Sequence, residues 1–174
     1  LNKGNMFEVD GTRSGVWIHI KAEGIGIGYM HQDYVSSSGS SGGAGSAAGI
    51  AQSTLNSRYN AGLSVDGIWG PASQEAYVCA IQKALNSVYG SGLVADGIWG
   101  SNTASACAAH PLSQGDNNSY VGVLQIGLYA HGITLTNGID NDFGPSTEQG
   151  VRSFQSMCGL DVDGIAGGNT FEQL

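Results

Sequence analysis

The five residues DGIWG occur twice in this chain, at 66–70 and again at 96–100. Flanking residues repeat at the same offset of thirty positions, among them Leu55 with Leu85. Several matches at one offset are not expected by chance, so the repeat constrains the fold before any single residue does. The chain is expected to use this motif as a recurring structural unit.

Two further copies of the motif follow, IDNDFGPST at 139–147 and the weaker VDGIAGGNT at 162–170. The four copies form two pairs, and a helix-like stretch separates the two members of each pair. This arrangement predicts two small domains of about 55–60 residues, each with an internal duplication, rather than an open solenoid.

Apolar residues recur with a period of about 3.6 residues after position 48, in the stretches 77–88, 121–131 and 151–158, which indicates amphipathic helices. Pro71 and Pro145 each follow a glycine directly and mark the first position of a helix. The motif is therefore predicted to be a turn that delivers an aromatic residue and then opens a helix.

The residue types of the motif suit a tight turn. Gly67 and Gly97 permit backbone angles that a side chain forbids, and the preceding aspartate can bond its own turn. One aromatic side chain buries about 150–250 Å², a large part of a small core. We expect a mainly structural role, with direct ligand contact left open, for Asp66, Trp69, Asp96, Trp99, Asp140, Phe143 and Asp163.

Residues 37–48 contain only Ser, Gly and Ala and are predicted to be a flexible linker. Residues 1–36, before it, have the period of two that is typical of β-strands. Strands are expected within 6–9, 15–22 and 24–30, with a turn at 10–15 and another near 22–24.

Thirty-six residues are too few to bury a self-sufficient core. The apolar face of the N-terminal strands is therefore expected to need a cover: a missing N-terminal fragment, a second copy of the chain, or the helical domains. We favour an intermolecular cover, because a flexible linker offers no fixed path for docking onto the helices.

The formal net charge of −8, with only six Lys plus Arg, argues against nucleic acid and against an anionic membrane surface as partners. No run of eighteen apolar residues is present, and the first residues carry no signal-peptide pattern. The cysteines Cys79, Cys107 and Cys158 are expected to be buried and reduced on apolar helix faces, with a Cys79–Cys107 bridge left open.

The residues from about 118 onwards resemble a peptidoglycan-binding domain of the small three-helix type found on bacterial and phage cell-wall hydrolases. The family pattern is matched by Leu124-Gln125, Phe143-Gly144, Thr147, Phe154-Gln155, Gly159-Leu160, Val162-Asp163-Gly164, Gly167 and Thr170. Residues 49–112 resemble a second, more divergent copy, in which Ile81-Gln82 stands at the Phe-Gln position; in the later copy Asn141 replaces the turn glycine.

The N-terminal stretch is similar to the later strands of a bacterial SH3-like domain. The resemblance depends on Lys3-Gly4, Trp17, Gly28-Tyr29-Met30 and Tyr34-Val35. It covers about half of such a domain and implies that its first hairpin, and a catalytic domain, precede this chain. The predicted fold is mainly α: a partial all-β segment at 1–36, a linker at 37–48, and two three-helix domains at 49–112 and 118–174.

The resemblance implies a non-catalytic region that binds peptidoglycan and targets an endolysin or autolysin, an amidase or muramidase, to the bacterial cell wall. No metal site, cofactor or catalytic residue is expected, because the four histidines lack ligand spacing and the acidic pairs belong to the motif turns. Two alternatives stay open: the chain is itself a peptidoglycan hydrolase, or it is a protein–protein assembly module.

Ligand contacts are expected from residues that the helix pattern leaves exposed beside the motif turns. The candidates are Tyr59 and Gln82 in the first domain and Tyr129, Arg152 and Gln155 in the second. Two weak sites on one chain would gain avidity on a repetitive surface such as peptidoglycan.

Overall fold

The computed structural model describes residues 8–14, 17–22, 26–31 and 43–174. The chain divides into two compact units, Leu1–Ser40 and Ser41–Leu174, which are described separately below.

The N-terminal unit contains a three-stranded antiparallel sheet in the order β1-β2-β3. Its strands are β1 (Glu8–Ser14), β2 (Trp17–Ala22) and β3 (Gly26–His31). β-Structure was predicted here, but the turn at 10–15 is wrong, because β1 continues through residues 10–14. The register shifts between Val9 and Arg13, and such an irregularity lets a strand absorb extra residues without ending. The side chains for which a cover was expected lie outside the described residues.

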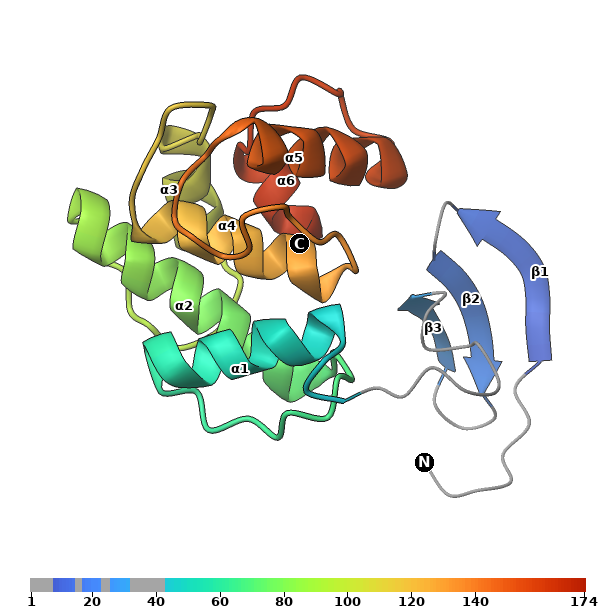
Figure 1. Cartoon of the computed structure of the whole chain (residues 1–174). Coiled ribbons are helices and arrows are strands. Elements are labelled where there is room, and N and C mark those ends of the chain that lie inside the picture. Colours follow the sequence, from blue (N-terminus) through green and yellow to red (C-terminus); the bar gives the residue numbers. More distant parts are fainter. Residues whose placement is uncertain (1–7, 15–16, 23–25, 32–42) are drawn as a thin grey trace. The chain divides into compact units, whose positions relative to one another are not determined.

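The second unit is helical (Figure 1). Its helices are α1 (Ala47–Tyr59), α2 (Pro71–Tyr89), α3 (Ser101–Ala109), α4 (Ser119–Ala130), α5 (Pro145–Cys158) and α6 (Gly168–Gln173). Three helices fall in each of the ranges 49–112 and 118–174, apart from the first residues of α1, as the motif pairs predict.

Each motif copy opens a helix. The last glycine of the motif is the extended N-cap residue of the helix, and Pro71 and Pro145 occupy the first helical position of α2 and α5. Proline suits this place because its missing N–H has no partner within the helix in any case. Gly100 and Gly167 do the same for α3 and α6 without a proline. The prediction that the motif is a turn that begins a helix is confirmed.

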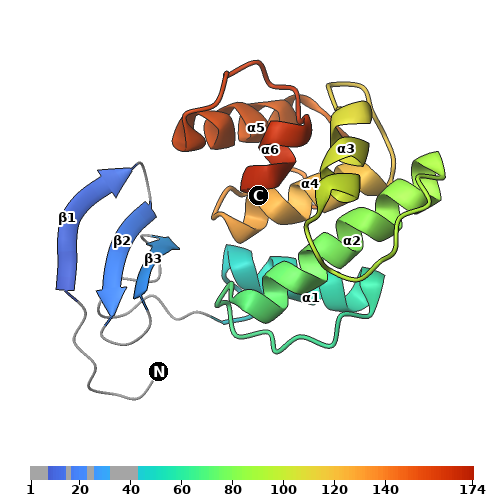
Figure 2. The same ribbon diagram turned by 180° about the vertical axis from the view of Figure 1, so that it is seen from behind.

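Helix α4 is the centre of the helical unit. Every residue from Tyr120 to Tyr129 is buried, and the helix packs against α1 and α2 of the first half as well as α5 of its own. Figures 1 and 2 show α4 between these two groups of helices from opposite sides. A helix that is apolar on all sides must be covered on all sides.

The two halves therefore share one core. Buried residues of α1 and α2, such as Leu55 and Ile81, belong to the same hydrophobic cluster as Leu124, Phe154 and Phe171. The expectation of two separate domains, each with a core of its own, is wrong. The physical reason is α4, whose faces away from α5 would be left in water without α1 and α2.

Polar contacts also join the halves. Leu112 pairs with Ala166 through two backbone hydrogen bonds of 3.0 and 2.8 Å. The Arg58 guanidinium on α1 donates to the Asn141 side-chain oxygen at 2.6 Å. Gly122 on α4 makes room for this pair, because a Cβ atom there would collide with the Asn141 side chain.

Candidate functional site

A buried glutamine holds each motif turn in place. In the third copy, Gln125 on α4 is 1% exposed. Its amide donates to the Asp140 carboxylate at 2.7 Å, to the Asp142 carbonyl at 3.0 Å and to Thr147 Oγ1 at 3.0 Å. Its oxygen accepts from the Asn141 N–H at 2.9 Å. One side chain thus satisfies polar groups on both sides of the turn, as a buried amide must.

The same set of bonds recurs in the other three copies. The glutamines are Gln52 on α1, Gln82 on α2 and Gln155 on α5, and each is 2% exposed. Each donates to the motif aspartate, to the carbonyl two residues later and to a Ser or Thr of the next helix, and accepts from the N–H after the aspartate. The sequence repeat is therefore a repeat of one hydrogen-bonded device.

The motif aspartates are solvent-exposed, but their carboxylates are hydrogen-bonded within the turn. The N–H two residues later donates to the carboxylates of Asp66, Asp96 and Asp163, and this bond, followed by the glutamine amide, lowers the pKa of each. At Asp140 partial desolvation alone would raise the pKa, but hydrogen bonds from Gln125 and the Asp142 N–H outweigh it. All four aspartates are therefore anionic parts of the turn rather than candidates for acid catalysis.

A second set of side-chain hydrogen bonds, here called the clip, holds the loop before three of the turns. The Asn56 side chain both donates to and accepts from the backbone of Leu63, at 2.8 and 2.7 Å, and Asn86 does the same with Leu93, at 2.7 Å for both bonds. In the third copy the Tyr129 hydroxyl takes this place, 3.4 Å from both backbone polar atoms of Leu135.

The motif aromatics pack inward. Phe143 is fully buried, and Trp69 and Trp99 pack against the core while partly exposed. Trp69 meets Tyr77 edge-on at a ring separation of 6.0 Å, and its indole N–H donates to Gln74 at 2.8 Å. These contacts are of a structural kind, and direct ligand contact by the partly exposed Trp69 and Trp99 stays a prediction.

Three of the five predicted ligand contacts are not exposed. Gln82 and Gln155 are the buried turn-holding amides described above, and Tyr129 is 6% exposed. A neighbouring turn or loop covers the helix face that carries these residues. That face is therefore buried, although the helical period alone leaves it outside the core. The expected exposure of Gln82, Gln155 and Tyr129 is wrong, so their polar atoms serve the fold.

Arg152 and Tyr59 are partly exposed. Arg152 lies over the last motif turn, where it donates to the Val162 carbonyl at 2.8 Å and forms an ion pair with Glu148 at 2.8 Å. Tyr59 lies at the end of α1, and desolvation by burial raises the pKa of its hydroxyl. Contact of either residue with a ligand stays a prediction.

The structure reveals exposed apolar residues that sequence reasoning did not single out. In three of the four copies an isoleucine follows the turn glycine, and its side chain is exposed. The exposed fraction is 56% for Ile68, 67% for Ile98 and 43% for Ile165. The signal was present in the sequence, because this residue directly precedes the residue that packs inward, which is Trp69, Trp99 or Ala166.

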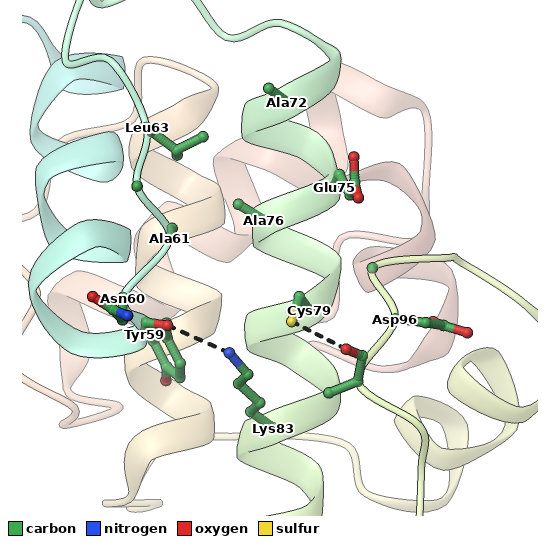
Figure 3. A pocket seen from close by; sticks show the side chains of 13 residues that line it. Tyr59, Asn60, Ala61, Leu63, Ala72, Glu75, Ala76, Cys79, Lys83 and Asp96 are labelled. Atoms are coloured by element: carbon green, nitrogen blue, oxygen red, sulfur yellow. Dashed lines mark hydrogen bonds between the residues drawn. The ribbon is translucent and has the colours of Figure 1, made fainter.

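A groove of about 440 Å³ lies along α2 in the first half (Figure 3). Residues 60–63 form one wall, and the turn 95–97 forms the other. The Cys79 thiol joins the floor to the second wall by donating to the Ala95 carbonyl at 3.5 Å.

All three cysteines are free, so the Cys79–Cys107 bridge is not formed. Cys107 is buried as expected, whereas Cys79 and Cys158 are only partly buried. Burial raises the pKa of the Cys107 thiol to about 11. Within the described ranges no group of three or more His, Cys, Asp or Glu residues is placed to hold a metal ion.

Comparison with known proteins identifies the second half. Residues 117–174 match the family described as a putative peptidoglycan binding domain. This segment includes α4, α5, α6 and the last two glutamine-held turns. The chain therefore contains a peptidoglycan-binding region of the kind that cell-wall hydrolases carry.

Two relatives are enzymes of the cell wall. N-acetylmuramoyl-L-alanine amidase CwlL of Bacillus licheniformis is 32% identical over 116 residues, which are 66% of this chain and 31% of that protein. Zinc D-Ala-D-Ala carboxypeptidase of Streptomyces albus G is 42% identical over 64 residues, 36% of this chain and 25% of that protein. The chain thus spans less than a third of the length of either enzyme. An uncharacterised protein of Kitasatospora aureofaciens is 40% identical over 63 residues, 36% of this chain and 53% of that protein.

No solved structure matches the chain. Among the residues that the structure describes, no helix is both long enough and apolar enough to cross a membrane.

Proposed function

We propose that this chain is the wall-anchoring, non-catalytic part of a larger peptidoglycan hydrolase, which it holds at the bacterial cell wall. The observation that carries the proposal is the match of residues 117–174 to a peptidoglycan-binding family. The amidase and the carboxypeptidase it resembles are far longer than this chain, which leaves room for a catalytic domain outside it.

The arrangement of side chains supports an anchoring role over a catalytic one. The motif carboxylates are engaged by backbone N–H groups and glutamine amides, and hydrogen bonds hold their pKa values low, whereas an acid catalyst needs a raised one. The partly exposed thiol of Cys79 donates to a backbone carbonyl and not to a base that would activate it.

The proposal extends to the first half of the helical unit. Residues 49–112 repeat the glutamine-held turns of 118–174, and the 116 residues matched to the amidase exceed the length of the family match. We assign both halves to one tandem peptidoglycan-binding-like module with a common core. The strands of residues 1–36 would belong to an SH3-like wall-binding segment that precedes it.

Sedimentation with insoluble peptidoglycan tests the proposal. The purified chain is incubated with isolated sacculi and centrifuged, and the suspension's turbidity is followed in parallel. We expect the chain to pellet while the turbidity stays constant. Chitin particles are the matched control, because they are an insoluble N-acetylglucosamine polymer without stem peptides.

Two other outcomes would overturn this function. A falling turbidity would make the chain a hydrolase in its own right. A chain that stays in the supernatant at low ionic strength, while pulling down only proteins, would make it an assembly module.

A further inference from the structure

The groove along α2 has features that the motif repeat does not explain. Ala72, Ala76 and Leu63 give it an apolar floor and wall, while Glu75 and Lys83 present exposed charges of opposite sign on the same helix (Figure 3). A structural turn needs neither the open volume nor the charges. The groove therefore combines apolar side chains with polar and charged groups, both of which a ligand site uses.

The second half closes the corresponding space. Leu135 is the counterpart of Leu63, because each is the residue that the clip holds before its turn. Leu135, however, is buried, with only 7% of its surface exposed. Gly150 stands where Ala76 does, five residues after the helix-opening proline, and a Cβ there would lie 2.8 Å from the Leu135 side chain and 3.4 Å from that of Ile133. The loop thus packs directly onto α5, and the two halves are not equivalent as binding surfaces.

The charges of the open groove are spaced for a short peptide. Glu75, Cys79 and Lys83 follow one another at intervals of four residues and so share a face of α2. Eight residues of α-helix correspond to about 12 Å along the axis. An extended chain spans about 3.3–3.6 Å per residue, so about three or four residues fit between the two charges.

Both walls come close to the charged residues of α2. Gly97, at φ +74°, brings the turn close to the Glu75 backbone and side chain. The Asp96 carboxylate points away from the groove and accepts from Gln82 at 2.9 Å (Figure 3). At the other end the Lys83 ammonium lies 3.4 Å from the Tyr59 carbonyl, which draws it toward the opposite wall. One end of the groove is thus negative and the other positive.

A peptidoglycan stem peptide has the matching chemistry. It is three to five residues long, carries small alanine side chains and free carboxylates, and presents an ammonium group where it contains a diamino acid. We propose that the groove between residues 60–63, α2 and the turn 95–97 binds this peptide in extended form, with Lys83 on a carboxylate and Glu75 on the ammonium group. The proposal rests on the wall-anchoring function and assigns peptide recognition to the first half of the unit, outside the family match.

Titration with soluble ligands, followed by amide NMR of the whole chain, tests the groove directly. The probes are the tetrapeptide L-Ala-γ-D-Glu-meso-diaminopimelyl-D-Ala and the tetramer of N-acetylglucosamine. We expect the tetrapeptide to shift amides of residues 60–63, α2 and 95–97 in a saturable way, and the glycan tetramer to leave them unchanged. Absence of saturable shifts with the peptide, or the same shifts with the glycan, would overturn the inference.

Charge variants test the two contacts. Glu75→Gln and Lys83→Gln should each weaken peptide binding about threefold to fivefold at low salt, the range of an exposed ion pair, and high salt should reduce the difference. Lys83→Arg should keep the wild-type affinity within about twofold, because it retains the charge. Glu172→Gln on α6 makes the same charge change as Glu75→Gln outside the groove and should have no effect. Equal affinities for all four variants would refute the assignment.

A steric variant needs no assumption about charge. Ala95 lines the groove, and Ala95→Trp should reduce peptide affinity at least tenfold, since the indole occupies the volume the ligand needs. Val94 is the adjacent residue, is 75% exposed and does not line the groove, so Val94→Trp is the control and should bind normally. Circular dichroism of both variants verifies that each is folded.

The two proposals fail separately. A chain that pellets with sacculi but binds no tetrapeptide keeps its wall-anchoring function and loses the groove. A chain that binds the tetrapeptide in the groove but does not pellet loses the anchoring function and keeps the peptide site.

Discussion

Replacing Gln125 by methionine should destabilise both halves of the helical unit at once. Methionine has nearly the same size and fills the space, but it removes all four hydrogen bonds and leaves the partly buried Asn141 N–H without its acceptor. A neutral hydrogen bond contributes about 0.5–1.5 kcal/mol and a buried unsatisfied group costs about 1–3 kcal/mol. We count the exposed Asp140 partner at the lower end of the range, which gives a total loss of about 3–4 kcal/mol.

Tryptophan fluorescence makes this prediction a test of the common core. The chain has three tryptophans, and in a Trp17→Phe background the remaining two, Trp69 and Trp99, both report on the first half. Gln125 lies on α4 in the second half. Urea unfolding followed by fluorescence should therefore shift as much as the same transition followed by helical circular dichroism.

Gln149→Met is the matched control, because Gln149 lies on α5 and is exposed. It should change the free energy of unfolding by less than about 0.5 kcal/mol, as surface substitutions usually do. If Gln125→Met lowered the circular dichroism transition but left the tryptophan transition in place, the halves would unfold independently. If it had no larger effect than Gln149→Met, the importance of the glutamine-held turn would be refuted.

Three further predictions concern the same unit. Gly127→Ala should cost about 1–3 kcal/mol of stability in urea unfolding, because its Cβ would collide with the buried Tyr77 hydroxyl, whereas Gly70→Ala, with nothing within 4 Å, should cost less than half as much. In folded protein at pH 8, Cys107 should resist a thiol-reactive dye and then react in urea, because burial raises its pKa to about 11; rapid labelling of Cys107 in the folded state would contradict this. In the folded protein the motif aspartates have pKa values below their ordinary 3.8, so their contribution to the free energy of unfolding is complete above about pH 5. It should be lost as the pH falls from there through the lowered pKa values. A free energy of unfolding in urea that stays constant between pH 6 and pH 3 would contradict this. The aspartates concerned are Asp66, Asp96, Asp140 and Asp163.

Much of the local structure could be predicted from the sequence because the turn chemistry is local. A glycine followed by Pro71 or Pro145 determines where a helix begins, and the repeat of Asp, Gly and an aromatic residue determines the turn. The helical faces around Ile81 and Phe154 follow from a period of 3.6. These features depend on neighbours within a few positions along the chain.

The common core could not be read from a repeat alone, because a repeat does not say what covers its outer face. The signal was in the composition of 120–129, where apolar residues surround the whole helix instead of forming one stripe. The roles of Gln82 and Gln155 were missed for a related reason. A glutamine in a helix is usually exposed, and only the turn that folds back over it, eight or more residues later, shows that it is buried.

The bridge between Leu112 and Ala166 also restricts how this protein can evolve. Modules joined by free linkers can be duplicated, lost or reordered, since neither depends on the other for its fold. Here the connection between the halves is itself held by this bridge to the last motif turn, and α4 needs the helices before it as a cover. Loss of one half would expose part of the common core, so the two halves of this chain are not interchangeable units that fold independently.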